Sequence, residues 1–192
     1  VDSPTTPQAI LAAIREQAFS IWFQPKVDAH SLEPVGVEAL ARWRQTDGSF
    51  ISPNLFIVAA ERAGIIGQLS GVLLQLALRE AAALHAAGYP MAISLNLSAL
   101  WLDDLNLPDL LLRSALEQGL RPADITFEVT ETGVTKDLAI ALDVLTRLRL
   151  KGFKLSIDDF GIGYSSFEQI GRIPFTEMKL DRSFVQRGTH DA

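Results

Sequence analysis

The adjacent acids Asp158 and Asp159 are the residues of this sequence best placed to do chemistry. They follow an apolar run, residues 153–157, and precede a loop with two glycines. The run predicts a buried strand that ends near the two acids. Neighbouring side chains of a strand point to opposite faces, but a turn at its end would let both carboxylates reach one point. Taken alone, such a pair is more typical of a solvated turn that caps a helix, so its interpretation depends on the rest of the chain.

Other strand-like segments also carry polar side chains on one face near their ends. The pairs are Ser94 and Asn96, Thr126 and Glu128, Ser156 and Asp158, and Glu177 and Lys179. Burying such a group without a partner costs roughly 2–7 kcal/mol. If these groups gather at one place, they can share metal ions and water. We therefore expect a single site built from Glu38, Asn96, Glu128, Asp158, Asp159 and Lys179.

The donor atoms of this set indicate a hard cation. Carboxylate and carboxamide oxygens suit Mg²⁺ or Mn²⁺, whereas zinc favours His or Cys. Four crowded acids repel one another, so two ions are expected, at the separation of about 3.5–4 Å that is usual for in-line attack on a phosphodiester. Calcium prefers longer bonds and more ligands than magnesium, and it should inhibit.

Two basic residues, Arg42 and Lys179, bring positive charge to the predicted site. Arg42 shares a strand face with Glu38 by a period of two, and it is suited to holding a phosphate oxygen. Lys179 is suited to orienting an attacking water or stabilising charge in the transition state. A simple ion pair of Lys179 with Glu177 or an aspartate fits its spacing equally well, and both interpretations stay open.

Six strands and six helices are predicted to position these residues. The strands are expected at 19–27, 35–43, 91–97, 125–129, 153–157 and 175–180, and the helices at 8–17, 53–63, 69–87, 108–118, 137–150 and 165–170. The short link between the first two strands makes them antiparallel. From the third strand onward helices and strands alternate, which indicates a parallel sheet.

The sheet is expected to close into a barrel rather than stay open. Active sites of barrels lie at the carboxyl ends of strands, where the polar pairs are predicted, and no glycine-rich phosphate loop follows the first strands. The expected fold is an α/β barrel of the TIM type, with about six of its eight strands present. A complete barrel has about 250 residues, so we expect either a further segment after Ala192 or a partner that covers the open edges. A chain that truly ends there should be poorly soluble or oligomeric, with little activity.

Composition narrows the class of protein. The chain has 192 residues, of which 48% are hydrophobic, enough for one core. A net charge of −6 without a Lys/Arg-rich block argues against binding to duplex nucleic acid or to a membrane surface. The chain has no cysteine, and no signal-peptide pattern opens it, so a cytoplasmic location is expected. Residues 1–7 resemble a linker from an upstream domain.

Several short motifs together resemble the EAL domain family, the cyclic di-GMP phosphodiesterases. They are Gln-Pro-Lys at 24–26, Glu-Ala-Leu-Ala-Arg-Trp at 38–43, Ser-Leu-Asn-Leu-Ser at 94–98, Phe-Glu-Val-Thr-Glu-Thr at 127–132, Asp-Asp-Phe-Gly-Ile-Gly-Tyr-Ser-Ser at 158–166 and Lys-Leu-Asp-Arg-Ser-Phe-Val at 179–185. Each motif alone is weak, but this order is highly specific, and the resemblance makes residues 8–192 one EAL-type domain.

The resemblance implies a fold, a reaction and roles for the site residues. The fold would be a modified TIM barrel with an antiparallel first strand. The reaction would be hydrolysis of cyclic di-GMP to linear 5′-pGpG in bacterial second-messenger signalling. By this resemblance, one metal ion would be bound by Glu38, Asn96, Glu128 and Asp158, and Asp159 would bind a second ion or bridge. Lys179 would contact the catalytic water, Arg42 and Leu40 would contact phosphate and guanine, and Gln24 would lie near the ligand.

The resemblance also implies regulation. Glu131 would anchor the loop 160–166, which in the family couples metal binding to dimerisation, so a homodimer is expected. A sensory or receiver domain is expected upstream.

Two departures from the family pattern affect these expectations. Ile162 stands where the family usually has threonine, which removes one hydroxyl from the loop. An Ala-Glu-Gly-Val-Glu motif, whose first glutamate joins the metal site, and a later Gln-Gly motif do not occur before Ala192. Part of the family's active site is therefore not found in this sequence.

Two other functions compete with the phosphodiesterase. A catalytically silent cyclic di-GMP receptor or interaction module would have the same fold, but silent members usually lose metal ligands, and every ligand expected in this span is present. A magnesium-dependent barrel lyase or aldolase would explain the carboxylates but not the placement of Arg42 and Leu40.

Overall fold

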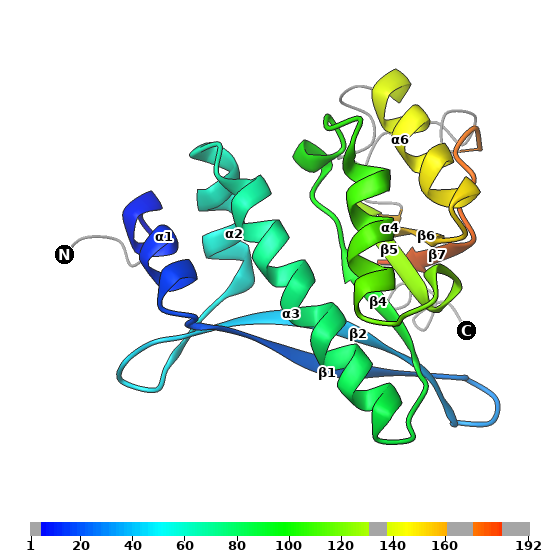
Figure 1. The fold of residues 1–192 in the computed structure, drawn as a ribbon, viewed down its shortest axis with the longest axis horizontal. Coiled ribbons are helices and arrows are strands. Elements are labelled where there is room, and N and C mark those ends of the chain that lie inside the picture. Colours follow the sequence, from blue (N-terminus) through cyan, green and yellow to red (C-terminus); the bar gives the residue numbers. More distant parts are fainter. Residues whose placement is uncertain (1–4, 131–137, 161–170, 182–192) are drawn as a thin grey trace, which may run out of the picture. The chain divides into compact units, whose positions relative to one another are not determined.

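The computed structural model describes residues 5–130, 138–160 and 171–181. The chain forms two compact units, residues 1–95 and residues 96–192. Each unit is described by itself below, with the labels of Figure 1.

A ribbon of two long strands is the base of the first unit. Strands β1 (Phe19–Val27) and β2 (Pro34–Arg44) are antiparallel, with Trp22 opposite Leu40 and Gln24 opposite Glu38. Strand β4 (Ala92–Asn96) runs parallel to β2. The predicted antiparallel start and the first parallel pair are therefore confirmed. The two-residue strand β3 (Phe50–Ile51), which pairs antiparallel with β2, was not predicted.

Three helices cover one face of this ribbon. They are α1 (Pro7–Arg15), α2 (Pro53–Arg62) and α3 (Ile66–Ala86) (Figure 1), with α2 packed on β2 and α3 on β1. Phe19 and Trp43 both contact Phe56 of α2, with ring centroids 5.4 and 5.8 Å away. Because side chains alternate along a strand, this packing leaves Trp22 and Gln24 on the other face, and both are exposed.

Local sequence signals explain the ends of the helices. Thr6 caps α1, where its Oγ1 accepts a hydrogen bond from the Ala9 N–H at 3.2 Å, so α1 begins at Pro7, one residue before the predicted range. Helix α3 begins three residues earlier than predicted. Beyond its last residue, Ala86, Gly88 has a left-handed backbone (φ 90°) and the Tyr89 N–H donates to the Leu84 carbonyl. This is the glycine-terminated end expected from the sequence.

Three parallel strands with helices form the second unit. Its elements are the 3₁₀ helix η1 (Ala99–Trp101), α4 (Leu107–Glu117), the 3₁₀ helix η2 (Pro122–Asp124), β5 (Ile125–Thr130), α6 (Leu138–Leu150), β6 (Lys154–Phe160) and β7 (Glu177–Leu180). Strand β6 pairs with both β5 and β7, with Ser156 opposite Glu128 and Glu177. Helix α6 packs against β6 and α4.

Strand β6 is longer than the sequence predicted. It continues through both acids to Phe160 instead of ending at residue 157. Asp159 has a left-handed backbone (φ 53°), and the register with β7 shifts between Ile157 and Phe160. Aspartate tolerates this conformation better than most residues. The sequence predicted that a turn after the strand would let both carboxylates reach one point. In the structure, the regular alternation of side chains is instead interrupted inside the strand, at Asp159.

None of the helices in the described ranges is both long enough and apolar enough to cross a membrane.

Candidate active site

Lys179 of β7 joins two acids from the neighbouring strands. Its Nζ lies 2.7 Å from Glu128 Oε2 on β5 and 3.3 Å from Asp158 Oδ1 on β6. All three side chains belong to the second unit, and each was predicted for the site. Of the two interpretations of Lys179, the structure contains the ion pair, and the pair is made with Glu128 and Asp158.

Glu128 is the most deeply buried member of this cluster. It is 1% exposed, whereas the side chains of Lys179 and Asp158 are 26% and 21% exposed. Its Oε1 is also buried and accepts no hydrogen bond within the described residues. A buried carboxylate is costly unless a positive charge compensates for it, and the ammonium of Lys179 supplies that charge.

Asp159 adds a further negative charge beside this cluster. Its backbone N–H donates to Asp158 Oδ1 at 3.0 Å, which fixes that carboxylate. Burial raises the pKa of the Asp159 carboxyl, and the charges of Asp158 and Asp181 raise it further, while Lys179 acts in the opposite direction. The negative charge here thus exceeds what one ammonium balances, which favours an additional cation.

Asn96 lies at the end of β4 and is exposed. The next residue, Leu97, donates its N–H to the Glu128 carbonyl at 2.8 Å. The backbone beside Asn96 is therefore tied to the strand that carries Glu128.

The predicted site residues of the first unit share one face of the β1–β2 ribbon. Glu38, Leu40 and Arg42 alternate along β2, and Gln24 lies opposite Glu38. Arg42 Nη1 donates to its neighbour's carbonyl, Ala41 O, at 2.9 Å. Its guanidinium carbon lies 5.4 Å from the centroid of the Trp22 ring.

Sequence reasoning assigned no role to two residues of this face. Trp22 and Lys26 flank Gln24 at a period of two, and Lys26 Nζ donates to Ser94 Oγ on β4 at 3.0 Å. Ser94, which the sequence predicts on the polar face of its strand, is 3% exposed. The period was the signal that could have found Trp22 and Lys26.

Metal binding can be judged from the donor atoms. Among the described residues, no three His, Cys, Asp or Glu side chains come together closely enough to hold a metal ion. Glu128 and Asp158 instead converge on one cation, the Lys179 ammonium. The oxygens of these acids are hard donors, of the kind that Mg²⁺ and Mn²⁺ prefer in proteins.

Some predicted features fall outside the described residues. These are Glu131, the loop residues 161–166 with Ile162, and the helix expected at 165–170. Their predicted roles stay predictions.

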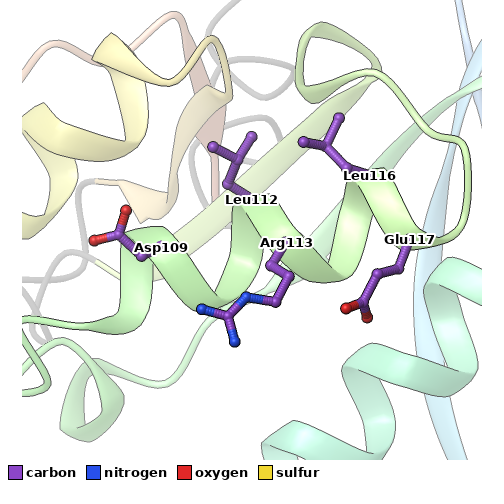
Figure 2. Close-up of a pocket in the computed structure, with 5 residues that line it drawn as sticks. All are labelled: Asp109, Leu112, Arg113, Leu116 and Glu117. Atoms are coloured by element: carbon purple, nitrogen blue, oxygen red, sulfur yellow. The ribbon is translucent and has the colours of Figure 1, made fainter.

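A separate hollow lies along helix α4. Its volume is about 490 Å³, and Asp109, Leu112, Arg113, Leu116 and Glu117 line it (Figure 2). Arg113 and Glu117 bring opposite charges, and none of the five residues belongs to the predicted site. The hollow is open, so it does not resemble an enclosed substrate pocket.

The EAL domain family model matches residues 8–192, and the chain belongs to this family. The fold is accordingly a TIM-like α/β barrel, as the sequence predicted. Phosphodiesterases of this family depend on metal ions.

Two curated relatives come from Pseudomonas aeruginosa. MucR, named as a bifunctional diguanylate cyclase and cyclic di-GMP phosphodiesterase, is 35% identical over 181 residues, covering 94% of this chain and 26% of MucR. RocR, named as a cyclic di-GMP phosphodiesterase, is 34% identical over 169 residues, covering 88% of this chain and 43% of RocR. The chain thus spans less than half the length of either relative.

A solved structure has the same fold. The MucR phosphodiesterase in complex with cyclic di-GMP has a TM-score of 0.85 and 35% identity, covering 95% of this chain and 76% of that one.

Proposed function

We propose that this chain is the catalytic domain of a phosphodiesterase that opens cyclic di-GMP to linear 5′-pGpG. The cluster of Lys179 with Glu128 and Asp158 is the observation that carries the proposal, because its charge and position suit work on a phosphodiester. Membership of the EAL family and relatives named as cyclic di-GMP phosphodiesterases support it.

The reaction adds water across one phosphodiester bond of the ring. The water oxygen bonds to phosphorus, the bond from phosphorus to the 3′ oxygen breaks, and that oxygen takes up a proton. The product carries a 5′ phosphate and a free 3′ hydroxyl. Bound Mg²⁺ or Mn²⁺ would supply Lewis acidity toward the water and the phosphate.

The residues divide into those that hold metal and those that hold substrate. Metal is assigned to Glu38, Asn96, Glu128 and Asp158, with Asp159 at a second or bridging position. Lys179 holds the charges of Glu128 and Asp158 in place and lies beside the reacting water. Arg42 binds a phosphate oxygen, Leu40 contacts a guanine base, and Gln24 contacts the ligand nearby.

The proposal includes the setting of the domain. We propose a cytoplasmic domain that acts as a homodimer below a sensory or receiver domain, with Glu131 anchoring the loop 160–166. Membership of the EAL family supports these features.

The test is product analysis with defined metals. The full-length protein is incubated with cyclic di-GMP and Mg²⁺, Mn²⁺ or Ca²⁺, and the products are identified by chromatography and mass spectrometry. We expect 5′-pGpG with Mg²⁺ or Mn²⁺ and none with Ca²⁺. Tight binding without hydrolysis under every condition would instead make the protein a cyclic di-GMP receptor.

A further inference from the structure

Trp22 is a large aromatic residue that stays exposed on the face carrying the proposed substrate residues. Its side chain is 53% exposed, although the chain has only three tryptophans and Trp43 is almost fully buried. Trp22 lies directly opposite Leu40 in the β1–β2 register. Cross-strand partners project from the same face of a ribbon, so Trp22 and Leu40 offer adjacent apolar surfaces on that face.

Two contacts hold the Trp22 ring. The Arg42 guanidinium carbon lies 5.4 Å from its centroid. The ring of Phe50 lies at the same centroid distance and is inclined by 73°. The partners come from β2 and the short strand β3, so the ring is oriented before any ligand binds, which lowers the entropy cost of binding.

The stack that Arg42 and Trp22 form is chemically suited to binding a nucleotide. An exposed indole offers a flat π surface on which a purine base can stack. A guanidinium beside it can pair with a phosphate oxygen while its own position is fixed by the ring and by the Ala41 carbonyl. A ligand that carries a base next to a phosphate would engage both groups at once.

We propose that Trp22 is a substrate-positioning residue that stacks on a purine base of the ligand and holds Arg42 in the orientation that receives the phosphate. This inference rests on the proposed function for the identity of the ligand. It adds a residue that the sequence motifs left unassigned. It also assigns β3 a role, since Phe50 supports the ring.

The test compares three variants of the full-length protein. They are Trp22→Ala, Trp22→Phe and the matched control Tyr89→Ala, which removes another exposed aromatic ring of the same unit, 64% exposed. Binding of cyclic di-GMP is measured by calorimetry with Ca²⁺ as the only divalent ion, and tryptophan fluorescence is followed in the same titration. Steady-state kinetics are measured with Mg²⁺.

A substrate-positioning role predicts a specific pattern. Trp22→Ala should weaken binding and raise KM by about tenfold or more, equivalent to about 1.4 kcal/mol, with kcat within about threefold of the parent. Trp22→Phe should retain binding within about threefold, and Tyr89→Ala should match the parent. Fluorescence quenching on ligand binding should be present in the parent and lost in Trp22→Phe.

Other outcomes separate this inference from the proposed function. Binding by Trp22→Ala within twofold of the parent overturns the role of Trp22 while hydrolysis by the parent still stands. A parent that binds but never hydrolyses overturns the proposed function and leaves the Trp22 stack intact. No binding by the parent protein overturns both. If Trp22→Ala lowers the melting temperature by more than Tyr89→Ala does, the variant Trp22→Phe, which retains an aromatic ring, decides. Binding by Trp22→Phe within about threefold of the parent supports stacking, and a loss of binding in Trp22→Phe as large as in Trp22→Ala contradicts it.

Discussion

Lys179 contributes to the stability of the second unit and also belongs to the proposed active site. Its ammonium lies within ion-pair distance of two acids, one of which is almost completely buried. Removing one partner of a buried pair leaves the other charge uncompensated in a medium of low dielectric constant. The same positive charge would compete with a divalent cation for these carboxylates. The ion pairs of Lys179 therefore stabilise the folded state, and under the proposed function they would also lower the affinity for metal.

Replacing Lys179 tests its contribution to stability. We expect Lys179→Met to lower the free energy of unfolding of the metal-free protein by about 3–5 kcal/mol, because the Glu128 carboxylate loses its partner. The control Lys151→Met removes a lysine that pairs with the exposed Asp109 at 2.6 Å, and it should cost less than about 1 kcal/mol. Urea unfolding in EDTA measures both. Equal losses in the two variants would show that the buried pair contributes no more than a surface pair.

Asp159 should make stability depend on pH in the metal-free protein. Its raised pKa in the folded state, caused by burial and by the charges of Asp158 and Asp181, means that folding favours the protonated form. This group therefore lowers stability as the pH rises from the ordinary aspartate pKa, about 3.9, through the raised folded value. We expect Asp159→Asn to be more stable than the parent at pH 7, with the difference vanishing below the ordinary aspartate pKa.

Thermal unfolding in EDTA across pH 3–8 measures that difference. Because the burial of Asp159 is only partial and much of the residue is exposed, solvent screening keeps the effect small. A parent that is more stable than Asp159→Asn at pH 7 in EDTA would contradict the direction of the pKa shift. With Mg²⁺, the order should reverse if Asp159 binds metal as proposed.

At the scale of elements, the pairing of β2 with β4 depends on one glycine. A Cβ on Gly36 would lie 2.9 Å from the Ala92 carbonyl oxygen on β4. That separation is too short for a carbon–oxygen contact, and backbone carbonyls move only if the strands separate. The close approach keeps the strand of Glu38 in register with the strand of Ser94 and Asn96.

Substituting this glycine should loosen the strand pair. We expect Gly36→Ala to cost about 1–3 kcal/mol of unfolding free energy, as overpacking does. The control Gly71→Ala lies in helix α3, where a Cβ meets nothing within 4 Å, and it should stabilise by about 0.5–1 kcal/mol. Chemical denaturation measures both changes. A gain in stability for Gly36→Ala would mean that β2 and β4 adjust freely.

How far the elements could be predicted depended on their length and packing. Helix α3 has apolar spacing and a glycine end, and its existence was predicted although its start was missed by three residues. Strand β3 has two residues, too few for any periodicity. The extension of β6 could not be foreseen, because it passes through Asp159, whose left-handed backbone no local sequence pattern indicates.

At the scale of the whole molecule, the proposed substrate contacts belong to one compact unit and the cluster of Lys179 with two acids belongs to the other. Gln24, Leu40 and Arg42 belong to residues 1–95, and Glu128, Asp158 and Lys179 to residues 96–192. The second group could be predicted because polar residues ending apolar strands meet at one edge of a parallel sheet. The stack of Trp22 and Arg42 was missed because an exposed tryptophan has no motif, and only the hairpin register places it opposite Leu40.

The central claim is that the carboxylate of Asp158 serves hydrolysis of cyclic di-GMP, and the rate of one variant tests it most directly. The measurement is kcat of the full-length Asp158→Asn protein with saturating Mg²⁺, beside Asp109→Asn. Asp109 is a matched control, because it is another aspartate paired with a lysine, outside the proposed site. We expect Asp158→Asn to lose about 100-fold or more of the parent's turnover, since it removes a charged metal ligand, while Asp109→Asn stays within about twofold. Turnover by Asp158→Asn within tenfold of the parent, in a folded protein, would contradict the claim.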